Sequence, residues 1–127
     1  MTARHKRVLI VDDATLVRAY YRQALERAGY EVDEAMNGLE GLEKVLMQPF
    51  DLAIVDVNMP QMDGMTFIRT LREKELPTSA IATLVTSTEA KEQDIAAARV
   101  AGANFYLTKP ISQENLVAHV VPLCGAA

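Results

Sequence analysis

The segment VLIVDD, residues 8–13, decides the class of fold, because four consecutive apolar residues lead directly into two carboxylates. An unbroken apolar run of this length is typical of a strand that is buried on both faces. Such strands occur in parallel sheets whose two faces are covered by helices. The segment therefore predicts an α/β domain with a buried first strand at 8–11, which ends at Asp12 and Asp13.

The remaining sequence alternates short apolar runs with longer segments of helical period. This alternation is expected when crossover helices join parallel strands. We expect strands at 8–11, 30–35, 52–55, 81–85 and 105–107, and helices at 14–28, 38–47, 65–74, 89–101 and from about residue 112 onwards. The strand at 30–35 carries several charges and is therefore expected at an edge of the sheet.

Two of these helices carry further expectations. The helix at 14–28 is expected to pack its apolar residues, Tyr20 among them, against the core. These residues are Leu16, Val17, Tyr20, Ala24 and Leu25. In the last helix, Pro122 lacks an N–H and clashes with the carbonyl four residues earlier, so this helix is expected to be short or bent.

The length and charge of the chain limit what it can be. At 127 residues it is long enough for one domain and too short for two. We expect an N-terminal extension at 1–6 and the folded domain at 7–127, with no output domain. The 13 Lys and Arg against 17 Asp and Glu give a net charge of −4, the wrong sign for holding a phosphate backbone. Direct binding of nucleic acid is therefore not expected.

Cysteine usage and hydropathy bear on the location of the protein. The single cysteine, Cys124, cannot form an intrachain disulfide, so a reducing cytoplasm is the expected location. No uncharged apolar stretch approaches the length of a membrane span or a signal-peptide core. Neither membrane insertion nor processing is expected.

Three carboxylates directly follow buried strands: Asp12 and Asp13 after 8–11, and Asp56 after 52–55. Parallel strands bring their carboxyl ends to one edge of a sheet, where the sites of α/β domains lie. Like charges at such short distances repel strongly, so the cluster needs a cation or raised pKa values. Oxygen ligands without Cys or His favour Mg²⁺ or Mn²⁺ over zinc. Taken alone, Asp12 or Asp13 is better explained as a helix cap, whereas Asp56 precedes VNMP at 57–60 and has no helix to cap.

Lys109 leaves the strand at 105–107 in the sequence Thr108-Lys109-Pro110. If its ammonium points back over the same edge, three carboxylates, one divalent cation and one ammonium sum to zero charge. Such a site is suited to receiving a phosphoryl group, because metal and lysine neutralise the phosphoryl oxygens while a carboxylate attacks in line. A solvent-exposed strand end is the alternative explanation for Lys109, and a plain turn is the alternative for Pro110.

With these residues in order, the chain closely resembles the receiver domains of two-component response regulators, and among them the stand-alone CheY-like group. The matching segments, which extend over nearly the whole chain, are VLIVDD at 8–13, Asp56 with NMPQMDG at 58–64, Val85-Thr86, EAK at 89–91, Ala97-Ala98, AGA at 101–103, Tyr106 and Lys109-Pro110. Their joint order and spacing are specific, although no single segment is decisive. The resemblance implies a flavodoxin-like, doubly wound, five-stranded parallel sheet in the order 2-1-3-4-5, with helices on both faces.

The resemblance also implies roles for the acidic residues. Asp56 is the expected phosphoacceptor. Asp13 and Asp56 are the expected side-chain ligands of Mg²⁺, and Asn58 adds its backbone carbonyl. Asp12 is expected to hold metal-bound water. The expected catalytic set is Asp56, Lys109, Thr86 and Asp12.

The remaining roles implied by the resemblance concern the switch. Lys109 is expected to contact the phosphoryl group and to precede Pro110 through a cis peptide bond. Thr86 matches the switch hydroxyl, and Tyr106 matches the aromatic residue that changes rotamer. A phosphoryl group adds negative charge and acceptor oxygens, which draw the Thr86 hydroxyl toward it and let Tyr106 turn inward. The spacing from Thr86 to Lys109 is one residue longer than the family pattern, with the extra residue around Ser87-Thr88, and this leaves the dephosphorylation rate open.

A receiver takes its phosphoryl group from a sensor histidine kinase or a phosphotransfer protein, and one or the other is the expected partner here. A downstream protein is expected to bind the helix at 89–101, the strand at 105–107 and the last helix. We expect a phosphoacceptor switch that assists its own phosphotransfer and dephosphorylation, not an enzyme with an external substrate. Chemotaxis, a phosphate sink and a relay remain alternative settings.

Two other classes of protein use related folds. A Mg²⁺-dependent phosphohydrolase also uses an aspartate nucleophile on an α/β sheet, but Asn58 stands where its Asp-x-Asp motif has the second acid, and no cap domain is expected. A nucleotide-binding or flavin-binding domain needs a Gly-rich loop after the first strand, where Asp12 and Asp13 stand instead.

Overall fold

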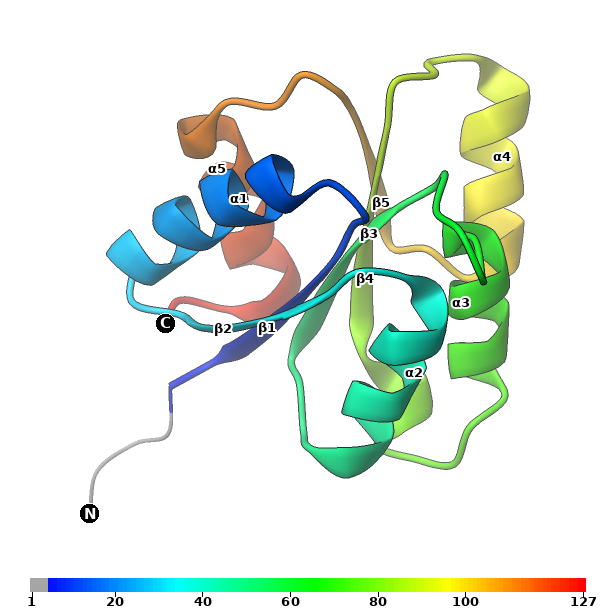
Figure 1. Cartoon of the computed structure of the whole chain (residues 1–127), viewed down its shortest axis with the longest axis horizontal. Helices are drawn as coiled ribbons and strands as arrows, with labels where there is room; N and C mark the ends of the chain where they lie inside the picture. Colours follow the sequence, from blue (N-terminus) through cyan, green and yellow to red (C-terminus); the bar gives the residue numbers. More distant parts are fainter. Residues whose placement is uncertain (1–4) are drawn as a thin grey trace.

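The computed structural model describes residues 5–127, which form a parallel sheet with helices on both faces (Figure 1). In chain order the elements are β1 (Arg7–Val11), α1 (Thr15–Arg27), β2 (Glu31–Ala35), α2 (Gly38–Met47), β3 (Leu52–Asp56), α3 (Gly64–Arg72), the 3-10 helix η1 (Thr78–Ala80), β4 (Ala82–Ser87), α4 (Glu92–Ala101), β5 (Phe105–Thr108) and α5 (Gln113–Cys124). Most of the predicted extension, 1–6, lies outside the described residues. Within the described part, no helix is both long and apolar enough to span a bilayer.

The five strands are all parallel and lie in the order β2-β1-β3-β4-β5. This order confirms the predicted flavodoxin-like sheet and places β2 at an edge, as its charges indicated. The strands β1 and β3 are neighbours, so their carboxyl ends, at Val11 and Asp56, lie side by side. In the register of β3 and β4, Asp56 is paired with Thr86.

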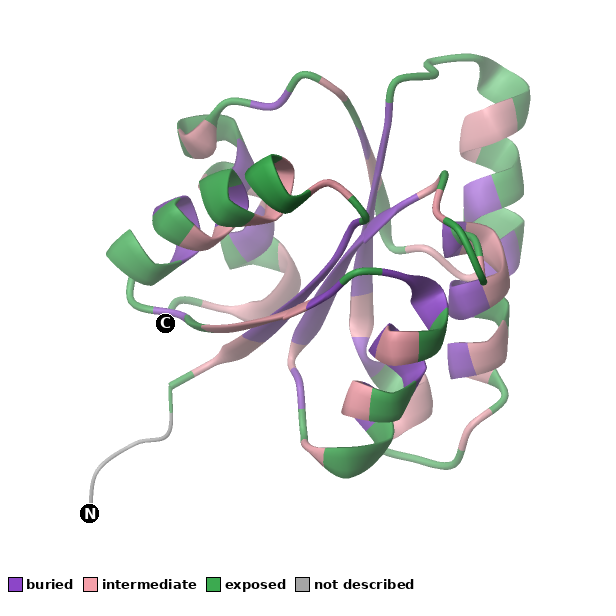
Figure 2. Ribbon diagram, viewed as in Figure 1, coloured by how far each residue is buried: buried purple, intermediate pink, exposed green. Residues whose placement is uncertain are grey.

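The sheet separates two cores, because alternate residues of a strand point to opposite faces. On one face, α1 and α5 cover a core that includes Ile10, Ile54 and Leu84; on the other, α2, α3 and α4 cover a core that includes Val55 and Val85 (Figure 1). Figure 2 shows the central strands β1, β3 and β4 largely buried between the two layers of helices, whereas the edge strands β2 and β5 are more exposed. By this alternation, Asp56 and Thr86 follow Ile54 and Leu84 onto the face that α1 and α5 cover.

The buried face of α1 differs by one position from the prediction. Tyr21 is 3% exposed, whereas Tyr20 is 44% and Leu16 is 85% exposed. The helix packs through a stripe at Val17, Tyr21 and Ala24, which has the four-residue and three-residue spacing of one helix face. Leu16 and Tyr20 lie beside this stripe and face outward, so the prediction that both pack in the core is wrong.

The last helix is not shortened by its proline. Although Pro122 lies within it, α5 continues to Cys124 over 12 residues. Proline removes only one helical hydrogen bond here, the one to the carbonyl of Ala118, and that residue is exposed, so water can satisfy the carbonyl. Of the two expected alternatives, the short helix is therefore wrong, because the proline stands in the final turn and not in the helix centre; the bent helix stays a prediction.

The helix α4 starts three residues later than the predicted start at Glu89. The hydroxyl of Ser87 accepts a hydrogen bond of 3.0 Å from the backbone N–H of Glu89. This local turn competes with helix formation and keeps the start of the segment in a loop. The first helical residue is instead Glu92, after Lys91 at the N-cap.

Candidate phosphoacceptor site

The carboxyl ends of β1 and β3 carry an acidic cluster of Asp12, Asp13 and Asp56. One carboxylate oxygen from each residue lies within 4.8 Å of the other two. Asp12 is 1% exposed and Asp56 is 8% exposed, whereas Asp13 faces solvent. The two buried carboxylates are therefore poorly hydrated, and their charges need partners within the protein or a bound cation.

Lys109 is the cationic partner of the buried carboxylates. Its Nζ lies 3.1 Å from Asp12 Oδ2 and 3.1 Å from Asp56 Oδ1, and its side chain is 18% exposed. The ammonium therefore points back over the sheet edge, as the charge balance required, and the Lys109–Pro110 peptide bond is cis. A backbone hydrogen bond from Lys109 N–H to the Ser87 carbonyl fixes the start of this loop against β4.

The titration of the site follows from burial and from these charges. Burial raises the pKa of Asp56, the negative charge of Asp12 raises it further, and the Lys109 ammonium offsets only part of the rise. Burial alone lowers the pKa of Lys109, but the charges and hydrogen bonds of Asp12 and Asp56 outweigh it, so the net pKa is raised. The lysine thus stays cationic, while the Asp56 carboxylate takes up a proton more readily than an exposed aspartate does.

The acidic cluster fits a hard divalent cation. Its donor atoms are carboxylate oxygens, which Mg²⁺ prefers, and the cluster contains no Cys or His. Three carboxylates and one ammonium leave a charge of −2, which a divalent cation neutralises. Asn58 lies in the loop after β3, two residues beyond Asp56, and is exposed at the same edge. The structure thus brings Asp12, Asp13, Asp56 and Lys109 together and places Asn58 next to them.

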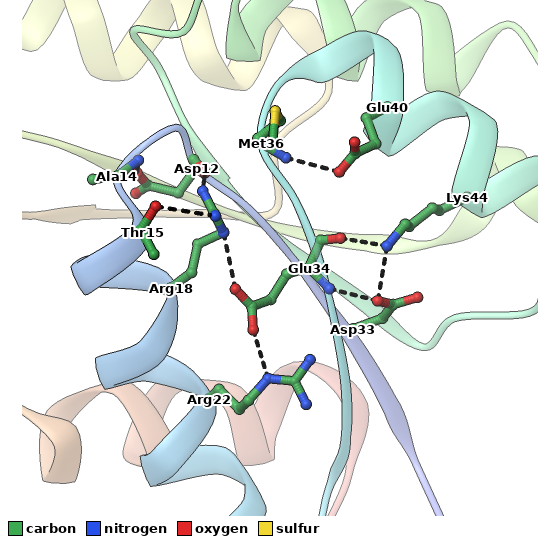
Figure 3. A network of polar contacts seen from close by, with 10 residues as sticks. All are labelled: Asp12, Ala14, Thr15, Arg18, Arg22, Asp33, Glu34, Met36, Glu40 and Lys44. Atoms are coloured by element: carbon green, nitrogen blue, oxygen red, sulfur yellow. Dashed lines mark hydrogen bonds and ion pairs between the residues drawn. The ribbon is translucent and has the colours of Figure 1, made fainter.

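The loop that carries Asp12 is held by Arg18, a residue that the sequence analysis missed (Figure 3). Arg18 donates to the backbone carbonyl of Asp12 at 2.7 Å and to Glu34 Oε1 at 2.9 Å. Arg22 binds the other oxygen of Glu34 at 2.6 Å. Asp12 Oδ1 also accepts a 2.9 Å hydrogen bond from Ala14 N–H, which fixes the carboxylate itself.

The far side of β2 is braced by a lysine, which also appears in Figure 3. Lys44 donates to Asp33 Oδ1 at 2.9 Å and to the Glu34 carbonyl at 2.6 Å. Asp33 and Glu34 of the edge strand are thus paired with basic residues of α1 and α2. The signal in the sequence was the group of acidic residues within 31–34, together with Arg and Lys residues in the two flanking helices. Which of them pair depends on how the helices pack on the strand, and this cannot be inferred from sequence spacing.

Thr86 and Tyr106, the predicted switch residues, lie on different faces of the sheet. Thr86 is fully buried, and among residues 5–127 its Oγ1 has no hydrogen-bond partner. Tyr106 is paired with Val85 in the strand register and packs against the core under α2, α3 and α4. Its hydroxyl donates to the Glu89 carbonyl at 2.8 Å. The two side chains therefore belong to different cores, one on each face of the sheet.

A doubly wound parallel sheet that gathers three carboxylates and a lysine beyond its strand ends defines the CheY-like class of signalling domain. Residues 8–121 match the response regulator receiver domain family, and the chain belongs to this family. It is accordingly a receiver domain of two-component systems, whose members bind Mg²⁺ at an acidic pocket of this kind.

Two kinds of protein relative are similar to the chain. It is 40% identical over 126 residues to the sensor protein EvgS of Escherichia coli strain K12. This match covers 91% of the chain and 10% of EvgS. It is 40% identical over 105 residues to the protein-glutamate methylesterase/protein-glutamine glutaminase of Archaeoglobus fulgidus, with 82% of the chain and 30% of that protein covered. The chain thus spans less than a third of the length of either relative.

Solved structures agree with this assignment. Vibrio cholerae chemotaxis protein CheY4 superimposes with a TM-score of 0.89 at 32% identity, covering 94% of this chain and 99% of that chain. A CheY-like response regulator receiver domain protein of Methanospirillum hungatei gives a TM-score of 0.86 at 30% identity, covering 94% and 93%. Both are receivers of about the same length as this domain.

Proposed function

We propose that this receiver domain is a phosphorylation switch that accepts a phosphoryl group on Asp56 from a histidine kinase or phosphotransfer protein. The observation that carries the proposal is the position of Lys109, whose Nζ lies at 3.1 Å from both Asp12 and Asp56 in a largely buried site. An ammonium shared between two carboxylates can bind an incoming phosphoryl oxygen without first being brought from solvent.

In the proposed reaction, a carboxylate oxygen of Asp56 attacks phosphorus opposite the donor nitrogen of a phosphohistidine. The new O–P bond forms as the P–N bond breaks, and the imidazole nitrogen leaves with the electron pair. Lys109 keeps its proton and binds one phosphoryl oxygen, which holds the group in line. Asp13, Asp56 and Asn58 would hold Mg²⁺, with Asp12 holding its water, and the cation would supply neutralising charge to the phosphoryl oxygens.

The proposed response to phosphorylation starts at Thr86. Its hydroxyl is buried without a partner within the described residues and stands opposite Asp56 in the sheet. A phosphoryl oxygen on Asp56 supplies the acceptor that this hydroxyl lacks, and leaving a buried hydroxyl unpaired costs roughly 1–3 kcal/mol. The phosphorylated state is thereby stabilised relative to the resting state, and the change in packing at Tyr106 follows as a population shift.

We place the downstream interaction on α4, β5 and α5. Side chains exposed there include Val100 at 88%, Phe105 at 44% and Val121 at 39%. The ring centroids of Phe105 and His119 lie 5.1 Å apart, and the two rings are tilted by 33°. Similarity to the Vibrio chemotaxis protein supports chemotaxis as the setting. In this proposal the protein assists its own phosphotransfer and dephosphorylation in the cytoplasm and has no external substrate.

The test is labelling with acetyl phosphate and Mg²⁺, followed by intact-mass measurement. Wild type is expected to gain one phosphoryl group, and Asp56→Asn is expected to gain none. Asp63→Asn is the matched control, because Asp63 lies in the following loop and caps α3 through Thr66 N–H, a role that asparagine also fills. Stoichiometric labelling of Asp56→Asn at another residue refutes the assignment.

A further inference from the structure

The loop at 57–63, which carries Asn58, is closed at its base by backbone hydrogen bonds. Gly64 N–H donates to the Val57 carbonyl at 2.9 Å, and Val57 N–H donates to the Thr86 carbonyl of β4 at 3.2 Å. The base of the loop is therefore fixed to the sheet. The path of the rest of the loop depends on what holds its outer part.

The N-terminus of α2 holds the outer part of this loop. Gly38 is the first residue of α2, and the backbone N–H groups in the first turn of a helix have no acceptor within the helix. The Gly38 N–H donates instead to the Met62 carbonyl at 3.2 Å. Asn37, which is 9% exposed, donates from Nδ2 to Gln61 Oε1 at 3.5 Å. Two successive residues of the loop are therefore hydrogen-bonded to the start of α2.

The contact at Gly38 leaves no room for a side chain. A Cβ atom at this position would lie 2.7 Å from the Met62 carbonyl oxygen and 2.9 Å from Met62 Cβ, and Cβ atoms essentially never come within 3.0 Å of such neighbours. The nearest of these atoms belongs to the backbone, so an added Cβ displaces the loop itself and not only a flexible side chain. Glycine is thus what lets α2 approach the loop so closely.

Both partners of this contact are held in a defined conformation. At the helix end, Asn37 Oδ1 accepts from Glu40 N–H at 2.8 Å, and Glu40 Oε1 accepts from Met36 N–H at 3.0 Å; the second bond is drawn in Figure 3. In the loop, Gln61 has a φ of 64°, in the left-handed region that residues other than glycine rarely adopt. Such a conformation persists only where the surrounding structure enforces it. The contact with α2 supplies part of that constraint.

Resting on the proposed function, in which Asn58 gives its backbone carbonyl to Mg²⁺, we propose that Gly38 and Asn37 are positioning residues for the metal. They act through the loop, because holding its outer part at α2 limits the directions that the Asn58 carbonyl can take. A ligand that is oriented in advance loses less freedom when the cation binds, so affinity rises. By linkage, Mg²⁺ binding strengthens the contact between α2 and the loop to the same extent.

The first experiment is a Mg²⁺ titration followed by NMR, which needs no phosphorylation. Gly38→Ala is expected to bind Mg²⁺ about tenfold more weakly than wild type, as is typical when a group that orients a metal ligand is lost. The matched control is Gly102→Ala, which is strained as well, because Gly102 has a φ of 114° and its Cβ would lie 2.8 Å from Arg72 Cγ. Gly102 follows α4 and precedes β5, at the opposite end of the sheet from the acidic cluster.

Gly102→Ala is therefore expected to lower the melting temperature and to leave the Mg²⁺ affinity unchanged. Wild-type affinity in Gly38→Ala overturns the proposal. An equal loss of affinity in Gly102→Ala also overturns it, because the loss then follows from general destabilisation and not from the loop.

A second variant decides the matter if Gly38→Ala does not fold. Asn37→Ser keeps an oxygen that can cap α2 and loses the amide that donates to Gln61. It is expected to bind Mg²⁺ about threefold more weakly, the equivalent of one weak net hydrogen bond. Unchanged affinity in Asn37→Ser, with Gly38→Ala folded and unchanged or not folded at all, overturns the proposal.

The reciprocal effect is measured in the wild-type protein by amide hydrogen exchange. Mg²⁺ is expected to slow exchange of the Gly38 N–H, which is bonded to the loop, more than that of the Gly102 N–H, which is bonded to carbonyls within α4. If Mg²⁺ changes both exchange rates equally, or changes neither, the coupling between α2 and the metal is refuted.

The outcomes separate this inference from the function on which it rests. If wild type does not bind Mg²⁺, the metal site of the proposed function is refuted, and the positioning role with it. If wild type binds Mg²⁺ and both variants bind it equally well, the role of α2 alone is refuted, and the phosphoacceptor assignment of Asp56 stands on its own labelling test.

Discussion

Replacing Lys109 by methionine removes the one cationic group that, among the residues the structure describes, forms ion pairs with the side-chain carboxylates of Asp12 and Asp56. At 3.1 Å and an effective dielectric of about 20, each ion pair has a Coulomb energy of roughly 5 kcal/mol, of which desolvation of the charges offsets a large part. Breaking a buried pair in this way typically costs about 3–5 kcal/mol. We therefore expect Lys109→Met to lower the free energy of unfolding by about 3 kcal/mol at pH 7 without Mg²⁺.

The same variant has a predictable pH dependence, because protonation of Asp56 limits the loss. The raised pKa of Asp56 means that the folded state binds this proton more readily than the unfolded state does. The stability lost in the variant cannot exceed the free energy of protonating one carboxylate. For an ordinary aspartate pKa this free energy is roughly 4 kcal/mol at pH 7 and about 1.5 kcal/mol at pH 5. The deficit of Lys109→Met relative to wild type should therefore shrink as the pH falls from 7 to 5.

Urea denaturation followed by circular dichroism, with EDTA present, measures both effects. Lys44→Met is the matched control, since Lys44 also contacts a carboxylate, but at a pair whose side chains are 30% and 27% exposed. Such partly exposed pairs contribute about 1 kcal/mol or less. If Lys109→Met unfolds at the same urea concentration as wild type, or if its deficit is equal at pH 5 and pH 7, the electrostatic account of the site is wrong.

Two further predictions concern the network behind Asp12. Arg18→Gln should lower the free energy of unfolding by about 1–2 kcal/mol and weaken Mg²⁺ binding in an NMR titration, because it loses the hydrogen bond to the Asp12 carbonyl. Arg22→Gln is the control, since Arg22 binds Glu34 and not Asp12, and it should leave the Mg²⁺ affinity unchanged. Equal Mg²⁺ affinities in the two variants would contradict a role of Arg18 in holding Asp12. Burial raises the pKa of Glu34, but hydrogen bonds from Arg22 and Arg18 outweigh this effect and lower the pKa overall. Ionised Glu34 therefore stabilises the folded state above pH 4.5, and this contribution is lost as the pH falls through the pKa of the folded state. The melting temperatures of wild type and Glu34→Gln should converge as the pH falls from 6 to 3, and a constant gap would refute this.

The sheet and the acidic cluster could be predicted because both depend on local sequence. The four apolar residues at 8–11 specify a buried strand, and because Asp12 follows them directly, they also specify where the Asp12 carboxylate lies. The direction of Lys109 was predictable only through charge balance, since no local rule aims a side chain across a sheet.

Features that depend on packing between elements were not predictable in the same way. Tyr20 and Tyr21 are adjacent and chemically identical, and only the rotation of α1 on the sheet decides which of them is buried. The bond from Arg18 to the Asp12 carbonyl likewise depends on how α1 leaves the first loop. The late start of α4 reflects a side-chain hydroxyl, that of Ser87, whose competition with the helix is local but weak.

The opposite orientation of Thr86 and Tyr106 determines how a signal can travel. One side chain belongs to the layer beneath α1 and α5, and the other to the layer beneath α2, α3 and α4. In the proposed switch, a change at Thr86 therefore reaches Tyr106 across the sheet, through the main chain of β4 and β5 and through the loop whose Glu89 carbonyl accepts a hydrogen bond from the Tyr106 hydroxyl. We therefore expect that, in the proposed switch, substitutions which stiffen β4 and β5 weaken the response at Tyr106 and leave phosphorylation of Asp56 unchanged.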